Sequence, residues 1–212
     1  LAGQLPKNIP SAKFFDAAAA IQSNSEIEKM VYPFVTDDPV FGYMAPLNLS
    51  DFFDAKKIAW LQNQVHRAEE EICIVYGIGA TLISPMPDLL VYADMPRWEI
   101  QIRYRKNSIS NIGTENADAE FPYQYKRSFF VDWRVCDRHK KATMKHWDYV
   151  IDNTIPASPK IISGTALRHA LSETVTRPFR VVPFFDPGPW GGQWLKEVCD
   201  LDREQQNFAW GF

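Results

Sequence analysis

A glycine-rich turn is the first place in this sequence where residue types suggest chemistry. Residues 75–82 read VYGIGATL, so Gly77 and Gly79 follow an apolar stretch rich in β-branched side chains. Phosphate-binding loops occupy such turns in α/β folds, because their backbone N–H groups face the anion. A P-loop also needs a lysine, and a dinucleotide fingerprint needs a third glycine, but neither follows Gly79. We therefore favour glycines that allow a tight turn over a phosphate-binding loop.

Asp94 is the sharpest single candidate, because it ends the apolar stretch LLVYAD at residues 89–94. In an open parallel sheet, the carboxyl ends of the strands line the ligand crevice. A carboxylate there can position magnesium or accept a proton from a hydroxyl group. It can equally cap the helix that we expect to begin near Pro96. The two interpretations are compatible, and both stay open.

Four arginines belong to this part of the sequence: Arg97 and Arg103 lie on or near one expected helix, and Arg127 and Arg134 flank the next expected strand. Small-molecule kinases hold phosphates with such arginines through bidentate hydrogen bonds. The alternative, which we favour, is a set of ordinary ion pairs with Glu99, Asp132 and Asp137 on solvated helix faces. The candidate ligand-binding set is completed by Asp94, Gly77 and Gly79, and no residue is predicted to be catalytic.

Gln64 and His66 match a zinc-binding Gln-x-His pair in letters only. The nearby apolar positions Ile58, Leu61 and Val65 follow helical spacing. Residues two apart on a helix point about 200° apart, so they cannot share one metal ion. We therefore predict a solvent-facing His66 on a helix rather than a metal ligand on a strand.

The three cysteines, Cys73, Cys136 and Cys199, are far apart in the sequence and odd in number. This arrangement indicates reduced thiols rather than a disulfide framework. Cys136 and His139 lie three apart on an expected helix, but no second soft ligand is near, so zinc is not expected there. His139 and His146 are predicted to be surface residues. We predict no metal and no cofactor for this segment.

Charge and hydropathy argue against two classes of partner. The 212 residues are 46% apolar with a formal net charge of −3, and nucleic-acid binders instead present a basic face. No stretch approaches the ~18 apolar residues of a membrane span, and the N-terminus lacks a secretory signal. We predict a cytoplasmic protein that binds neither nucleic acid nor membrane. Its start at Leu1 rather than Met suggests a piece of a longer natural chain.

Strands and helices alternate along most of the chain. The pattern predicts strands at residues 72–77, 89–94, 129–133 and 148–152, and helices at 54–71, 96–106, 135–146 and 165–175. Such alternation is typical of an α/β fold in which crossover helices cover a parallel sheet. Ser25 and Glu28 have capping-box spacing ahead of a further short helix, and Asp54 can cap the helix at 54–71.

The composition changes after Asp152, where a linker-like stretch precedes one more helix and then a segment rich in proline, glycine and aromatic residues. We predict an α/β domain at residues 1–155, a linker and helix at 156–176, and the start of another, β-rich part at 177–212.

Three long strings resemble bacterial class I mannose-6-phosphate isomerase-like proteins. They read DLLVYADMPRWEIQIRYR, YKRSFFVDWRVCDRHKK and PFRVVPFFDPGPWGGQWLKEVCDLD. In those proteins an extra α/β region precedes the isomerase cupin, and PWGGQWL is similar to the start of the catalytic part. The resemblance extends from about Thr36 to Phe212 and implies that residues 177–212 are the incomplete start of a cupin.

The resemblance also implies a chemistry that this segment lacks. The family interconverts mannose 6-phosphate and fructose 6-phosphate through an enediol, with zinc held by a Gln-x-His strand, a Glu and a further His. These ligands cannot be placed here, because Gln64 and His66 lie far ahead of PWGG and on a helix. We expect a non-catalytic N-terminal portion of the isomerase, with its own C-terminal cupin domain as partner and zinc in that domain.

The α/β region also resembles a P-loop nucleoside or sugar kinase, because LLVYAD leads into a helix that bears Arg97 and Arg103. The missing lysine indicates a degenerate kinase. The alternative function is therefore a nucleotide-binding or sugar-phosphate-binding (pseudo)kinase module, with a phosphorylated small molecule as its ligand. A live kinase is the least favoured hypothesis.

Overall fold

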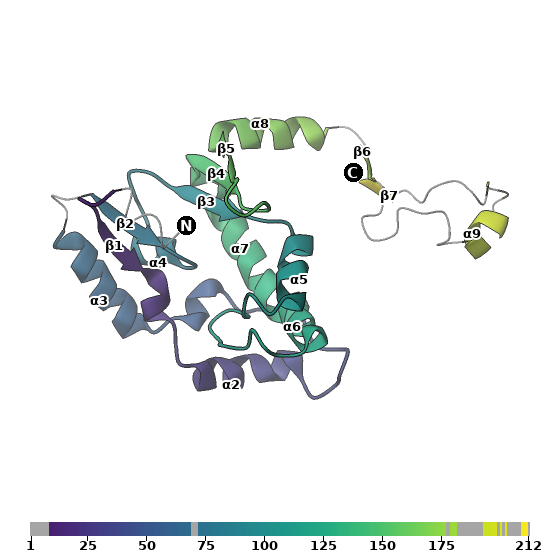
Figure 1. The fold of residues 1–212 in the computed structure, drawn as a ribbon, viewed down its shortest axis with the longest axis horizontal. Coiled ribbons are helices and arrows are strands. Elements are labelled where there is room, and N and C mark those ends of the chain that lie inside the picture. The colour runs from purple at the N-terminus through teal and green to yellow at the C-terminus, as the bar shows by residue number, and fades with distance from the viewer. Residues whose placement is uncertain are drawn as a thin grey trace. The chain divides into compact units, whose positions relative to one another are not determined.

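The computed structural model (Figure 1) describes residues 9–68, 72–176, 179–181, 193–198, 200, 202 and 209–211. The chain divides into two compact units, Leu1–Ile161 and Ile162–Phe212. The division falls inside the segment 156–176, where we placed a linker and a helix. The PWGG turn at residues 189–192 and Cys199 lie outside the described residues, so the three-part domain division stays a prediction.

The first unit holds short strands and a series of helices. Its strands are β1 (Lys13–Asp16), β2 (Cys73–Tyr76), β3 (Val91–Asp94) and β4 (Tyr149–Asp152). Its α-helices are α2 (Asn24–Val35), α3 (Ala55–His66), α4 (Ala80–Ile83), α5 (Arg97–Arg105), α6 (Phe121–Arg127) and α7 (Trp133–Thr143). Short 3-10 turns are η1 (Ala17–Ala20), η2 (Leu49–Phe52) and η4 (Met144–His146), and η3 (Ser128–Asp132) is π-helical.

The second unit is described only in pieces. They are α8 (Gly164–Thr174), β6 (Phe179–Val181), α9 (Gln193–Val198) and β7 (Ala209–Gly211). β6 and β7 pair in antiparallel fashion. The strand β5 (Lys160–Ser163) contains the division between the two units.

The strands form small separate sheets. β1 pairs with β2 and β3 with β4, both in parallel, and β5 follows β4 in the strand order. The predicted mixed α/β fold with parallel strands is therefore confirmed. The strands predicted at 72–77, 89–94 and 148–152 correspond to β2, β3 and β4. We had expected one continuous parallel sheet. Among the described residues, β2 instead lies in one sheet and β3 and β4 lie in another.

The largest correction concerns residues 129–133, which we predicted as a strand. They are helical, because α6 runs through the π-helical turn η3 into α7. The fully buried side chains along this stretch include four that are three or four residues apart, as on one helix face: Gln124, Ser128, Val131 and Val135. Two of these four are polar. The apolar run FFV therefore has the composition of a strand. The helical spacing becomes visible only when the buried polar residues are counted with the apolar ones.

The helix caps were predicted in part. Asp54 caps α3, and its Oδ1 accepts hydrogen bonds from the backbone N–H groups of Lys56 and Lys57 at 2.7 and 3.1 Å. The capping box of α2 uses Ser23 and Glu26, whereas we had predicted Ser25 and Glu28. The same i, i+3 spacing occurs twice in this stretch, so the sequence pattern does not distinguish the two pairs.

The hydrophobic core joins α2, α3 and the η3–α7 stretch. Its fully buried members include Ile27 and Val31 of α2, Phe52 of η2, and Val131 and Val135. Burying each such side chain contributes roughly 1.5–3 kcal/mol. The β3–β4 pair is attached differently, because Tyr92 stacks on the buried Trp147 with ring centroids 4.0 Å apart. Helix α7 thus has the core on one side and side chains that reach β3 on the other.

Candidate functional site

Asp94 lies at the carboxyl end of β3, in register with Asp152 at the end of β4. Its carboxylate forms an ion pair with Lys140 of α7. It also accepts a hydrogen bond from the backbone N–H of Met95 at 3.0 Å. Helix α5 begins after Pro96 without a side-chain cap, so the capping role that we considered for Asp94 is wrong. The carboxylate is instead half-exposed and balanced by one lysine.

The neighbouring strand end is held by its own turn. Asp152 accepts hydrogen bonds from the backbone N–H and the hydroxyl of Thr154, and the hydroxyl bond is the main reason that the pKa of Asp152 lies below its usual value. Arg103 donates to the backbone oxygen of Asn153 at 2.9 Å and pairs with Glu99 at 2.8 Å. Arg103 therefore connects α5 to the end of β4, as a structural residue does.

Arg97 and Arg134 converge on one carboxylate. The Nη2 atoms of Arg97 on α5 and Arg134 on α7 lie 2.6 and 3.5 Å from Oδ2 of Asp137. Arg97 also lies over the ring of Trp133, 5.1 Å from its centroid. The side chains of Arg97 and Asp137 are 46% and 49% exposed, so solvent reaches this pair. Two guanidinium groups thus share one exposed carboxylate beside the end of β3.

This cluster contains two buried hydrogen-bond donors that lack a partner in the described part of the chain. The indole Nε1 of Trp133 and the Nε of Arg134 have no hydrogen-bond partner among the residues that the structure describes. A buried donor without a partner costs about 1–3 kcal/mol. Such a cost is typical of a site where a ligand or an ordered water completes the hydrogen bonds.

Arg127 has a different environment, because its side chain is completely buried. It donates to Glu28 of α2 at 2.6 Å and to the backbone oxygen of Ile112 at 2.8 Å. Its Nε lies 3.6 Å from Oδ1 of Asp132, which is an ion pair but too long for a hydrogen bond. Arg127 therefore joins three parts of the chain and has no surface for a ligand.

Arg127 belongs to a buried polar network that we did not predict from the sequence. The Nδ2 of Asn111 donates to Asp132 at 2.7 Å and to Ser128 at 2.9 Å, and the hydroxyls of Ser128 and Tyr104 are 2.6 Å apart. Burial raises the pKa of Asp132 above its usual value and that of Tyr104 to about 12. The stretch 106–120 has loop composition, so its sequence carries no signal that Asn111 is buried.

The glycine-rich turn follows β2 as predicted, and steric contacts explain its second glycine. Gly77 and Gly79 have φ angles of 94° and 84°. A Cβ on Gly79 would lie 2.3 Å from the ring of Phe53. These contacts support the interpretation that the glycines allow a tight turn, although they do not test phosphate binding.

Thr81, which follows this turn, is hydrogen-bonded to His139 of α7 with Oγ1 and Nε2 2.9 Å apart. We predicted His139 to be a surface residue, and this is wrong, because the ring is half-buried against α4. Burial lowers its pKa below the usual 6.5 and favours the neutral ring. The prediction for His146 is confirmed, because its side chain is exposed.

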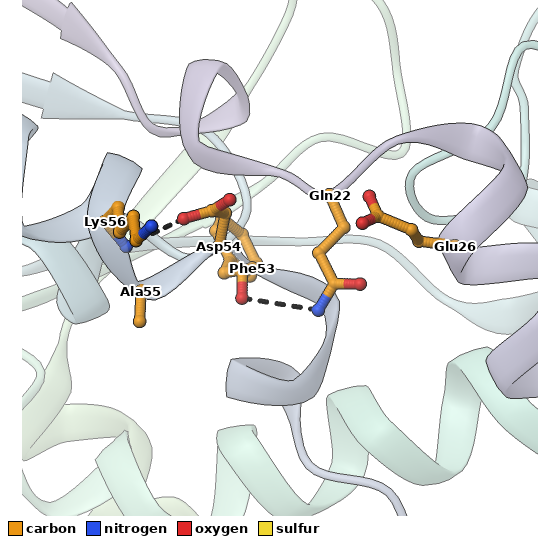
Figure 2. A pocket seen from close by; sticks show the side chains of 6 residues that line it. All are labelled: Gln22, Glu26, Phe53, Asp54, Ala55 and Lys56. Carbon is orange, nitrogen blue, oxygen red and sulfur yellow. Dashed lines mark hydrogen bonds between the residues drawn. The ribbon is translucent and has the colours of Figure 1, made fainter.

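An open depression lies between the beginnings of α2 and α3 (Figure 2), lined by Gln22, Glu26, Phe53, Asp54, Ala55 and Lys56. Its two carboxylates already bind the chain itself. Glu26 accepts a hydrogen bond from Ser23, which lowers its pKa, and the backbone N–H bonds to Asp54 lower the pKa of that residue. Both carboxylates of this depression therefore act as caps of their helices.

The described part of the chain contains no cluster of His, Cys, Asp and Glu side chains that could hold a metal ion. Gln64 and His66 both lie on α3 and His66 is exposed, which confirms the predicted helical setting. Cys73 and Cys136 are free thiols. None of the described helices is long and apolar enough to cross a membrane.

Comparison with known proteins identifies the family. A family model described as "Domain of unknown function (DUF8485)" matches residues 1–176. The chain belongs to the DUF8485 family. Neither the curated proteins nor the solved structures gave a match. The DUF8485 match includes every candidate residue, from Gly77 to Arg134, together with Asp137 and Lys140.

Proposed function

We propose that this chain is a non-catalytic binding module of sugar-phosphate metabolism, which holds the phosphate group of a small molecule beside the carboxyl end of β3. The observation that carries the proposal is the convergence of Arg97 and Arg134 on Oδ2 of Asp137. The two arginines come from different helices. Their common position is therefore a product of the fold and not of sequence proximity.

The chemistry of this cluster suits a phosphate. Guanidinium groups bind phosphate oxygens in pairs, through charge-assisted hydrogen bonds. Arg97 and Arg134 share only one carboxylate, which leaves excess positive charge, and Asp137 is exposed enough to move aside. The unpartnered Nε of Arg134 and indole N–H of Trp133 are further donors of the same region.

Isothermal titration calorimetry on the whole chain tests this proposal, with inorganic phosphate, mannose 6-phosphate, fructose 6-phosphate and AMP as ligands. At least one should bind, and R97Q and R134Q should each weaken binding about tenfold or more, since a charged hydrogen bond contributes ~1.5–3 kcal/mol. The matched control is R67Q, at an exposed arginine on the end of α3. Absence of binding by all four ligands, or unchanged affinity in both variants, would refute the proposal.

The finer description of the fold also belongs to this proposal. We propose that the α/β unit is a degenerate relative of P-loop nucleoside kinases. It is supported by the parallel pair β1–β2 with a Gly77–Gly79 turn directly after β2, and by the absence of a lysine from that turn. Lys140 also pairs with the carboxylate of Asp94, the group that would position magnesium.

Phosphoryl transfer is tested with ATP, magnesium and hexose acceptors. We expect no turnover above a protein-free blank. Turnover that is abolished in D94N would identify a live kinase and would overturn the degenerate-kinase assignment. Turnover that persists in D94N would indicate a contaminating enzyme and would leave the expected inactivity standing.

We further propose that the chain precedes the cupin of a cytoplasmic mannose-6-phosphate isomerase, with that cupin as its partner. The support is the resemblance of residues 88–105, 125–141 and 178–202 to such proteins. Gln64 and His66 lie on α3 and point about 200° apart, so they do not fit the family's zinc site. We therefore assign zinc chemistry to the cupin alone.

This relationship has two direct tests. The gene downstream of the codon for Phe212 is expected to encode a cupin with a Gln-x-His strand, and a different kind of domain there would contradict the relationship. Incubation of the present chain with zinc and mannose 6-phosphate is expected to produce no fructose 6-phosphate. Isomerisation by this chain would show that the active site is not confined to the cupin.

A further inference from the structure

A group of large apolar side chains is exposed at the end of α2 and on the loop that follows it. We define this loop patch as Tyr32, Val40, Phe41, Tyr43 and Met44, whose exposed fractions are 56, 63, 71, 70 and 51%. Isolated exposed apolar residues are common on protein surfaces, but contiguous groups mark interaction sites. The patch lies outside the Arg97–Arg134 cluster on α5 and α7, so it is independent of the proposed phosphate site.

The loop that carries the patch is held in one conformation by its own hydrogen bonds. Oδ1 of Asp38 accepts the backbone N–H groups of Val40 and Phe41 at 2.7 and 2.6 Å. The backbone N–H of Tyr43 donates to the oxygen of Phe34 at 2.7 Å. A Cβ on Gly42 would lie 2.3 Å from that same oxygen, so the close approach requires glycine.

Two cations attach the loop to the α6–α7 helices. Lys126 is only 6% exposed and donates to the backbone oxygens of Thr36 and Asp38. Arg138 donates to the backbone oxygens of Ala45 and Leu47. A surface loop that is fixed in this way while its aromatic side chains face water is preorganised, which lowers the entropic cost of binding a partner.

The charged side chains of the loop itself are negative. Residues 32–45 contain Asp37 and Asp38 but no lysine or arginine. Hydrogen bonds from Phe41 and Val40 lower the pKa of Asp38, so that carboxylate is ionised at neutral pH. Helix α2 also ends at Val35, and the carbonyl end of a helix carries partial negative charge. The two cations that attach the loop, Lys126 and Arg138, are both bound to its backbone carbonyl oxygens.

We propose that the loop patch is a docking surface for a polypeptide segment that presents an aromatic or aliphatic side chain next to a lysine or arginine. The apolar side chain would pack on Phe41 and Tyr43, since aromatic residues dominate the binding energy of protein interfaces. The basic residue would face Asp37 and the end of α2. A second copy of this chain does not fit, because two such patches would bring like charges together.

The experiment uses a random peptide library displayed on phage, selected on the whole chain and counter-selected on the F41S/Y43S double variant. Enriched peptides are expected to combine aromatic or aliphatic residues with lysine or arginine. As synthetic peptides, they should bind the wild type at least about tenfold more tightly than the double variant, and salt should weaken the binding. D37N should weaken it severalfold, because the basic residue loses its partner.

The control variant is M86S, because Met86 is 92% exposed and lies outside the patch. It should bind the peptides as the wild type does. Both F41S/Y43S and M86S should melt at the wild-type temperature, since their side chains are exposed, and this separates lost docking from lost folding. Failure to enrich peptides, enrichment without basic residues, or equal binding by the double variant would overturn the proposal. So would patch-dependent binding to phosphatidylcholine vesicles, which would assign the patch to a lipid surface.

Discussion

Arg127 and Glu28 are 99 residues apart in the sequence, and their Nη1 and Oε1 atoms lie 2.6 Å apart in the structure. This ion pair joins the end of α6 to α2, and its guanidinium also reaches Ile112 and Asp132. Arg127 is thus the centre of a polar network inside the first unit. It is also the one candidate arginine whose side chain is completely buried, in contrast to Arg97, Arg103 and Arg134.

Replacing this buried cation should destabilise the fold. R127M removes the partner of Glu28 and leaves Asp132 buried beside an uncharged side chain, which should cost about 3–5 kcal/mol in the free energy of unfolding. Urea denaturation followed by circular dichroism measures the change. R67M, at an exposed arginine, should change stability by less than about 0.5 kcal/mol. A similar small effect for R127M would contradict the assignment of Arg127 as a structural residue.

The hydroxyl of Tyr104 supports the same network. Y104F removes its 2.6 Å bond to Ser128 and its 3.3 Å bond to Asn111. We expect a loss of about 1–2 kcal/mol, because buried polar groups are left without a partner. The comparable change Y43F lies on an exposed tyrosine and should be neutral. Equal stability of Y104F and wild type would mean that the network tolerates the loss without penalty.

The glycine-rich turn gives a steric prediction. G79A should destabilise the chain by about 1–3 kcal/mol, because alanine is strained at a φ of 84°, and its Cβ would also meet Phe53. In an F53L background, G79A should cost less stability than it does in the wild type, because the smaller side chain relieves the steric contact. G77A should cost less, since its Cβ would come no closer than 3.2 Å to Asp16. Unchanged stability of G79A would contradict the steric role of this glycine.

His139 predicts a dependence of stability on pH. Burial lowers its pKa below 6.5 in the folded chain, so the unfolded chain binds the proton more readily. Its contribution to stability is therefore complete above pH 6.5 and is lost as the pH falls through the folded pKa. The stability difference between wild type and H139Q should decrease over that range. An NMR titration that places the pKa of His139 at or above 6.5 would contradict this prediction.

Local patterns in the sequence were sufficient for much of the fold. The apolar runs that end in Tyr76, Asp94 and Asp152 became strands, and the cap at Asp54 began a helix as predicted. These signals depend on neighbouring residues only, through side-chain periodicity and backbone caps. The same reasoning failed at residues 129–133, because the buried face of that helix includes the polar Gln124 and Ser128.

The candidate site also has features that follow from local sequence and features that depend on tertiary packing. From sequence alone, Asp94 was placed at a strand end and Arg97 and Arg103 on or near a helix, since each placement follows from its own segment. Arg134 was placed beside a strand at 129–133, and that stretch is helical. Only the tertiary structure decided their partners: Lys140 for Asp94, Asp137 for Arg97 and Arg134, and a buried network for Arg127. The physical reason is that an ion pair depends on how distant segments pack together. That packing joins residues tens of positions apart, and no local pattern in the chain records it.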